Sequence, residues 1–307
     1  MSPAVTAPFG RVLTAMVTPF RDDGALDPAA AAELATHLVD HGNDGLVVSG
    51  TTGESPTLTD DEQDRLLRAV VEAVGDRASV VAGVGTFDTA HSIGLAEAAA
   101  AAGADGLLVV SPYYSKPPQS GLSAHFAAVA DATDLPVMLY DIPGRTGVKI
   151  SAETLARAAE HDRIVAVKEA SGDLYAGSWL MRETDLAIYC GDDALNLPWL
   201  AIGAVGVVSV VGHVAGKRYA DMVAAIDSGD LEQARKIDRS ILPALGAIMT
   251  RTQGAIMAKA ALELSGRLPN RHVRLPLVEA TDAQVAELRR DLVTADLLEI
   301  ASLQGTA

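Results

Sequence analysis

The stretch Gly42-Asn43-Asp44-Gly45-Leu46-Val47-Val48 recurs as Gly103-Ala104-Asp105-Gly106-Leu107-Leu108-Val109, and more weakly as Gly203-Ala204-Val205-Gly206-Val207-Val208. In each copy a glycine can end a helix, a tight turn follows, and an apolar run starts a strand. Because one helix–turn–strand unit is repeated, the sequence favours a closed barrel of such units over an open doubly wound sheet.

Apolar runs of this kind continue along the chain on both sides of these copies. Between them lie Ala-, Leu- and Glu-rich segments with helical spacing, such as residues 28–39 and 60–74. Short runs without polar alternation are typical of parallel strands that are buried on both faces. The eight runs cover residues 12–17, 45–49, 80–84, 106–110, 136–140, 164–168, 186–190 and 206–210. Eight β-α units of this length predict an α/β protein with a (β/α)8 TIM barrel.

The barrel is expected to occupy residues 10–228, with a further segment on each side. Residues 1–9 contain neither the basic nor the apolar region of a signal peptide and are predicted to be a disordered tail. Residues 229–307 are predicted to form a C-terminal helical domain that packs on the barrel or serves in assembly. Its helices are expected over residues 231–261 and 283–301, with Asp282 capping the last one and breaks at Gly229, Pro243 and residues 266–276.

Composition restricts the partners that the protein can have. The 307 residues carry a formal net charge of −16, whereas nucleic acids and anionic membranes are bound by positive surfaces. No apolar stretch is long enough to span a membrane. The single cysteine, Cys190, cannot form an intrachain disulfide and fits a reducing compartment. We therefore expect a cytoplasmic protein that binds small molecules, and neither nucleic acid nor membrane.

Lys168 is the most informative single residue. It ends the apolar run Ile164-Val165-Ala166-Val167, and strand alternation places it on the same face as Ile164 and Ala166. A lysine buried at the end of a core strand tends to lose its proton, and the neutral amine forms Schiff bases with carbonyl compounds. The alternative is a strand-end lysine whose ammonium group reaches water along its flexible side chain.

Other side chains with chemical potential follow neighbouring strands, at the barrel end where function is expected. Thr51 and Thr52 can direct hydroxyl and main-chain N–H groups at an anion, or can belong to an ordinary turn. The hydroxyl of Tyr140 can relay protons, and Arg145 can hold a carboxylate with two parallel hydrogen bonds. Their alternatives are a tyrosine at the edge of the core and an arginine in a surface ion pair.

Tyr114 lies in a loop with several prolines and a second tyrosine, which is expected to form a rigid lip or a subunit contact. Asp192 and Asp193 could bind Mg²⁺, but their position favours the capping of a helix. The candidates at strand ends all fall on one face of the barrel, and this convergence favours a shared site. They are Thr51, Thr52, Tyr114, Tyr140, Arg145 and Lys168.

Four motifs carry a resemblance that covers essentially the whole chain from about Gly10. They are Gly50-Thr51-Thr52-Gly53-Glu54, Tyr113-Tyr114, Tyr140-Asp141-Ile142-Pro143-Gly144-Arg145-Thr146-Gly147 and Val167-Lys168-Glu169-Ala170. The chain thereby resembles the dihydrodipicolinate synthase / N-acetylneuraminate lyase family of pyruvate-dependent class I aldolases. This resemblance implies a Schiff-base-forming carbon–carbon lyase that needs no metal and no organic cofactor, assembled as a homotetramer, a dimer of dimers.

The resemblance also implies catalytic roles. Lys168 would form the Schiff base with pyruvate, and Tyr140 would donate and accept protons during imine formation. Thr51 and Tyr114 would complete a proton relay, with Tyr114 contributed across a subunit interface.

Substrate-binding roles follow in the same way. Thr52 and the main chain around Val208 would hold pyruvate, with Gly191 nearby. Arg145 would bind the carboxylate of the second substrate.

Within the family, Thr51-Thr52 together with Arg145 resembles the synthase branch. That branch condenses pyruvate with L-aspartate 4-semialdehyde to 4-hydroxy-tetrahydrodipicolinate, in the diaminopimelate route to lysine. The alternative is an aldolase or lyase of another 2-oxo acid, such as a 2-keto-3-deoxy sugar acid or N-acetylneuraminate.

The chain departs from its relatives at several positions. Asp141 stands where many relatives carry Asn, and Gly144 where many carry Ser. Lysine-inhibited members use His, Asn and Glu at positions that align here with other residues, so we expect L-lysine to inhibit weakly or not at all. Those aligned residues are Asp60, Gln63, Phe87 and His91.

Overall fold

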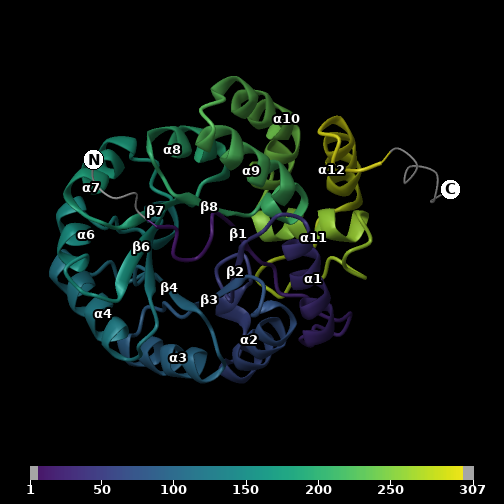
Figure 1. Cartoon of the computed structure of the whole chain (residues 1–307). Coiled ribbons are helices and arrows are strands. Elements are labelled where there is room, and N and C mark those ends of the chain that lie inside the picture. Colours follow the sequence, from purple (N-terminus) through teal and green to yellow (C-terminus); the bar gives the residue numbers. More distant parts are fainter. Residues whose placement is uncertain (1–5, 300–307) are drawn as a thin grey trace.

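The computed structural model describes residues 6–299, in which eight parallel strands close into a barrel in chain order (Figure 1). Each strand pairs with the next, and the last returns to pair with the first. The strands are β1 (Val12–Ala15), β2 (Gly45–Val48), β3 (Ser79–Gly83), β4 (Gly106–Val110), β5 (Val137–Asp141), β6 (Ile164–Glu169), β7 (Ala187–Cys190) and β8 (Gly206–Ser209). This confirms the predicted TIM barrel. The first five residues of the predicted tail lie outside the described part of the chain, as do residues 300–307.

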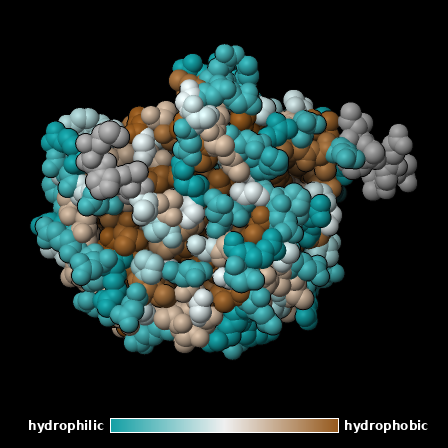
Figure 2. Space-filling view, viewed as in Figure 1, coloured by the Kyte–Doolittle hydropathy of each residue, from teal (hydrophilic) through white to brown (hydrophobic). Residues whose placement is uncertain are grey.

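Helices surround the barrel and cover its outer face (Figure 1). The ring consists of α1 (Pro28–Asp40), α2 (Asp60–Val74), α3 (Thr89–Ala101), α4 (Gln119–Asp131), α5 (Pro143–Thr146), α6 (Ala152–Ala158), α7 (Leu174–Glu183), α8 (Asn196–Ile202) and α9 (Gly212–Asp227), with 3₁₀ turns η1 (Ser55–Thr57) and η2 (Asp193–Leu195). On the face seen in Figure 2, hydrophilic residues cover most of the outer helices, and hydrophobic residues show in patches between them. The helices therefore turn their apolar sides inward, as amphipathic helices on a barrel do.

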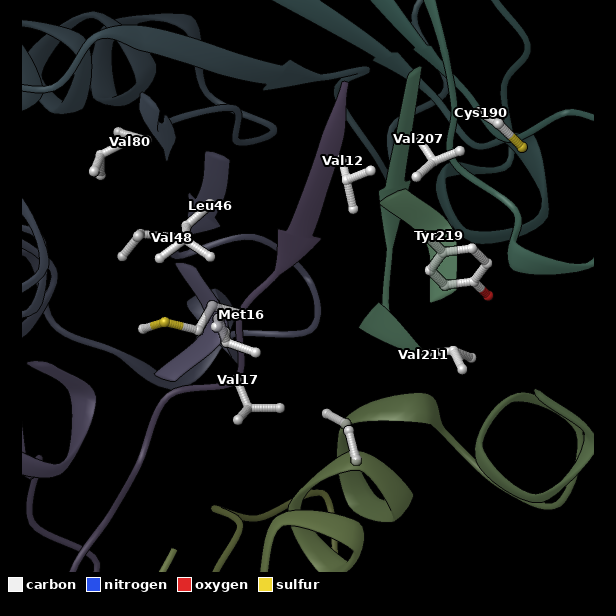
Figure 3. Packing of buried hydrophobic residues seen from close by; sticks show 14 of the residues in the cluster. Val12, Met16, Val17, Leu46, Val48, Val80, Cys190, Val207, Val211 and Tyr219 are labelled. Carbon is white, nitrogen blue, oxygen red and sulfur yellow. The ribbon is translucent and has the colours of Figure 1, made fainter. Parts of the chain in front are cut away.

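Two hydrophobic clusters result, one outside the strands and one inside. The outer cluster fills the space between strands and helices, where Val12, Val207 and Val211 lie beside Tyr219 (Figure 3). The inner cluster fills the barrel itself and includes Phe9. Because β-strand side chains alternate, each strand supplies both clusters.

Phe9 closes the amino-terminal end of the barrel. Its main-chain N–H donates to the hydroxyl of Tyr189 at 3.2 Å, and its ring is buried. A side chain at Gly106 would place its Cβ 2.3 Å from this ring, so the ring requires a glycine there. The prediction that Phe9 belongs to a disordered tail is therefore wrong. Its aromatic ring fills the amino-terminal end of the barrel, which fixes the chain before Gly10.

A bulge in β6 corrects one detail of the predicted alternation. The pairing between β5 and β6 shifts register at Val137 and Met138, so Ile164 joins the outer cluster while Ala166 joins the inner one. Lys168 remains on the inner face with Ala166, as predicted. An extra residue in one strand changes the face of the residues before it and leaves those after it in place.

The C-terminal extension consists of α10 (Leu231–Met249), α11 (Gly254–Leu264) and α12 (Asp282–Thr294), which lie together on one side of the barrel (Figure 1). The break predicted at Pro243 is wrong, because α10 continues through it and the chain turns only after Met249. Burial of the apolar side of α10 offsets the hydrogen bond that a proline removes. Thr281, not Asp282, caps α12, in a reciprocal capping box with Gln284.

Within the described residues, no helix is both long and apolar enough to cross a membrane.

Candidate active site

Lys168 and Tyr140 lie side by side at the carboxyl ends of adjacent strands. The register of β5 and β6 pairs the two residues directly, and the Lys168 Nζ atom lies 4.3 Å from the centre of the Tyr140 ring. Lys168 is only 5% exposed, so its ammonium group does not reach bulk water. The alternative of a strand-end lysine in solvent is therefore wrong.

The surroundings of Lys168 favour a neutral amine. Burial lowers the pKa of Lys168 to about 8; the negative charge of Asp193 opposes this shift, and the positive charge of Arg145 adds to it. With this pKa, about a tenth of the amine is neutral at pH 7, whereas an ordinary lysine is almost fully protonated. A neutral amine is the form that attacks a carbonyl carbon.

A second lysine is buried, and it must be distinguished from the first. Lys259 is 1% exposed, and burial lowers its pKa to about 8 as well, against the charge of Glu54. Its Nζ atom donates to Glu54 Oε1 at 2.5 Å and to the carbonyl oxygen of His272 at 2.7 Å. Because this amine is held by two acceptors and comes from α11 and not from a strand, the structure favours Lys168 as the nucleophile.

A cavity of about 380 Å³ opens beside Tyr140 at the same end of the barrel. Its wall includes Thr51, Tyr140 and Arg145, which the sequence predicted to share a site. Lys168 adjoins this cavity through its contact with the Tyr140 ring. The guanidinium group of Arg145 is exposed at the cavity and has no hydrogen-bond or ion-pair partner among residues 6–299, whereas its main-chain N–H donates to the carbonyl oxygen of Ile142 at 2.9 Å. Its guanidinium group is thus available to an anionic ligand, and the predicted alternative of a surface ion pair does not apply.

Of the positions predicted to hold pyruvate, Gly191 lies directly against Lys168. A side chain at Gly191 would place its Cβ 2.8 Å from Lys168 Cγ, so only a glycine leaves room for the lysine there. Val208 belongs to the inner cluster with Tyr140, and Thr52 is buried. The loop that carries Thr52 is fixed by Thr18, whose hydroxyl donates to the carbonyl oxygen of Gly53 at 2.6 Å.

Tyr114 is not brought to the cavity within one chain. It is 94% exposed and has a left-handed φ of 70°, so its ring points away from the barrel. The neighbouring Tyr113 lines the cavity instead and packs edge-to-face on Phe87 at 5.5 Å between ring centres.

Burial also sets the protonation states of the groups on β5. It raises the pKa of Tyr140 to about 12, so the phenol stays protonated and can donate a hydrogen bond near pH 7. It raises the pKa of Asp141 to about 7, and Asp141 accepts from the N–H of Ile150 at 3.1 Å. Near pH 7 the carboxyl group of Asp141 is therefore about half protonated.

The sequence did not reveal the part that Asp193 plays. Asp192 caps η2, since it accepts from the N–H of Ala194 at 3.1 Å, as the prediction of a helix cap requires. Asp193 is buried instead and accepts hydrogen bonds from the end of β8 and from α9. Two adjacent aspartates look alike in sequence, and only the fold separates the half-buried cap from the buried carboxylate.

The fold and the strand-end lysine define the class of the protein, a TIM-barrel enzyme of the Schiff-base-forming carbon–carbon lyase type. The chain belongs to the dihydrodipicolinate synthetase family, whose model matches residues 8–295.

Relatives and solved structures resemble the chain over nearly its whole length. A 4-hydroxy-tetrahydrodipicolinate synthase of Kineococcus radiotolerans is 65% identical over 290 residues, which are 94% of each chain. The enzyme of the same name from Acidothermus cellulolyticus is 65% identical over 96% of this chain and 95% of its own. The lysine-bound dihydrodipicolinate synthase of Cyanidioschyzon merolae is 44% identical, covers 95% of this chain and 100% of its own, and has a TM-score of 0.92.

Proposed function

We propose that this chain acts as a 4-hydroxy-tetrahydrodipicolinate synthase, condensing pyruvate with L-aspartate 4-semialdehyde in the diaminopimelate route to lysine. The observation that carries the proposal is the buried, strand-end Lys168 beside Tyr140 at a cavity with an unpaired arginine. Relatives that are 65% identical over most of their length bear this name.

The first half of the reaction joins pyruvate to the enzyme. The Lys168 amine attacks the C2 carbonyl carbon, and loss of water leaves a cationic iminium. Tyr140 gives its proton to the departing oxygen, which fits a phenol that burial keeps protonated. Thr52, Gly191 and the main chain around Val208 hold the pyruvate, with its carboxylate directed at main-chain N–H groups.

The second half forms the carbon–carbon bond. The iminium withdraws electrons, so a C3 proton leaves and the resulting enamine attacks the aldehyde carbon of the second substrate. Ring closure by the amino group of that substrate on C2 then releases Lys168 as a free amine. Arg145 holds the carboxylate of the second substrate, and Tyr140 exchanges protons through Thr51 and Tyr114.

Tyr114 enters this relay from a second copy of the chain. A tyrosine that is 94% exposed next to a cavity-lining tyrosine supports an interface at this edge. We propose a homotetramer built as a dimer of dimers, in the cytoplasm.

Turnover of alternative substrates tests the proposed function. Pyruvate consumption with L-aspartate 4-semialdehyde is compared with pyruvate release from 2-keto-3-deoxy sugar acids and from N-acetylneuraminate. We expect kcat/KM for the semialdehyde to exceed that for either sugar acid by about 100-fold or more. The semialdehyde carries a carboxylate on its aldehyde part, which Arg145 can bind, whereas the carboxylate of these sugar acids belongs to their pyruvate part. Preferred cleavage of a sugar acid would overturn the proposal in favour of a lyase.

Arg145→Ala is expected to lower kcat/KM for the semialdehyde by about 10- to 100-fold, since it removes a charge-assisted bidentate hydrogen bond. Borohydride trapping of pyruvate should change little. Trapping is compared above pH 8, because Arg145 also contributes to the lowered pKa of Lys168, which is about 8. Arg182→Ala, at an exposed arginine of α7, is the matched control. Semialdehyde kinetics that remain unchanged in Arg145→Ala would refute the assignment.

A further inference from the structure

Asp193 has a buried carboxylate that is surrounded by hydrogen-bond donors. It is 4% exposed, and its Oδ1 atom accepts from the hydroxyl of Tyr219 at 3.0 Å, from Asn196 Nδ2 at 3.2 Å and from the hydroxyl of Ser209. No cation forms an ion pair with it in the part of the chain that the structure describes. Donors on every side, without a cation in contact, match an ionised carboxylate.

The other carboxylate oxygen fixes the turn that follows β8. Asp193 Oδ2 accepts from the main-chain N–H of Val210 at 2.8 Å and from that of Val211 at 3.1 Å. These residues lead into α9, whose N-cap, Val211, has no side chain that can cap the helix. Asp193, which follows β7, therefore fixes the turn between β8 and α9 and holds the chain directly after Val208 and Ser209.

The segment that carries Asp193 also lies against Lys168: a Cβ at Gly191, two residues before Asp193, would lie 2.8 Å from Lys168 Cγ. Of the carboxylates, Asp193 is the one whose charge raises the pKa of this lysine. The other groups acting on this lysine are Arg145, a cation, and Cys190, whose thiol has a pKa that burial raises well above its usual value. Tyr140, against which the amine lies, has its pKa raised to about 12. Near pH 7 both Cys190 and Tyr140 are neutral, so Asp193 supplies the fixed negative charge at this lysine.

We propose that Asp193 is a positioning residue that provides the countercharge for the iminium formed on Lys168 and fixes the pyruvate-holding turn after β8. This inference rests on the proposed Schiff-base function. An iminium is cationic at every pH, and a buried cation without a countercharge is unstable. In the proposed mechanism the carboxylate of pyruvate is directed at main-chain N–H groups, and Arg145 adds a second positive charge near Lys168, so the iminium still requires a fixed anion.

Asp193→Asn tests the countercharge with little change of shape. The amide oxygen can accept from Val210 and Val211, and the amide nitrogen can donate to the oxygens of Tyr219 and Ser209, whose hydroxyl groups rotate. We expect borohydride trapping at sub-saturating pyruvate to fall by about tenfold, with KM for pyruvate rising more than kcat falls. The acidic limb of kcat/KM should move to lower pH by about one unit, because loss of a nearby anion disfavours the Lys168 ammonium.

Tyr219→Phe is the matched variant, since it removes one hydrogen bond to Asp193 and keeps the carboxylate charge. We expect this variant to have a lower Tm, while the acidic limb of its kcat/KM profile does not move to lower pH. If Asp193→Asn does not fold, Tyr219→Phe alone remains decisive, because a limb at lower pH in this variant would overturn the proposal. The proposal would also be overturned if Asp193→Asn showed the pH profile of kcat/KM and the borohydride trapping of pyruvate of the wild-type protein. If the wild-type protein itself traps no pyruvate, the Schiff-base function fails instead.

Discussion

Replacement of Lys168 by alanine is expected to lower the condensation rate by about 10⁴-fold or more and to abolish the pyruvate adduct that borohydride traps. In the proposed mechanism the amine becomes covalently bonded to the substrate, and burial keeps it partly neutral beside Tyr140, which lines the cavity. Without it, Tyr140, Thr51 and Arg145 can still bind substrates but have no covalent intermediate to protonate.

Intact-mass measurement after borohydride reduction detects the pyruvate adduct or its loss. The Lys168→Ala variant also contains an internal control. Lys259 remains in Lys168→Ala, and burial lowers its pKa to the same value of about 8. If a lowered pKa alone made a lysine reactive, Lys259 would still form an adduct. An adduct that persists in Lys168→Ala would therefore contradict the assignment, and peptide mapping would identify the lysine responsible.

Lys259→Met is expected to lower the free energy of unfolding by about 3–5 kcal/mol, because it leaves the buried carboxylate of Glu54 without a countercharge. Both side chains of this pair are 1% exposed, and they join α11 to the loop that carries Thr51 and Thr52. Activity should fall as well, since that loop loses its anchor. Urea unfolding followed by circular dichroism measures the loss.

A double-mutant cycle and an exposed pair give the controls for this prediction. The double variant Glu54→Leu/Lys259→Met should be more stable than either single variant, because no unpaired charge remains. Lys236→Met breaks an exposed pair with Glu232 on α10 and should change the free energy of unfolding by only about 0.5 kcal/mol. Equal losses in Lys259→Met and Lys236→Met would contradict the argument.

The barrel could be predicted because its evidence is local. Each strand is a short apolar run, each turn repeats a glycine pattern, and parallel strands place their carboxyl ends at one edge. Tyr140 and Lys168 end such runs and Thr51 comes shortly after one, so their convergence could be predicted from the strand count alone. The bulge in β6 could not be foreseen, because it depends on the register against β5.

The charged interior of the protein could not be predicted, because it depends on residues that are distant in sequence. Lys259 lies in an apolar helical stretch, and its partner Glu54 is separated from it by 205 residues. Asp193 is distinguished from Asp192 only by donors from β8 and α9. The orientation of Tyr114 likewise follows from a left-handed residue in a proline-rich loop.

The ion pair between Glu54 and Lys259 has a consequence for the order of events during synthesis. The loop with Thr51 and Thr52 leaves the ribosome early, but the amine that neutralises Glu54 is added only when α11 is made. Arg274, later still, donates its main-chain N–H to the same carboxylate at 2.9 Å and pairs with Glu62 at the start of α2. A nascent chain with a complete barrel therefore still has an unfinished substrate site, and contacts of such long range fold late. The loop that carries Thr51 and Thr52 thus reaches its final contacts only with the last quarter of the polypeptide.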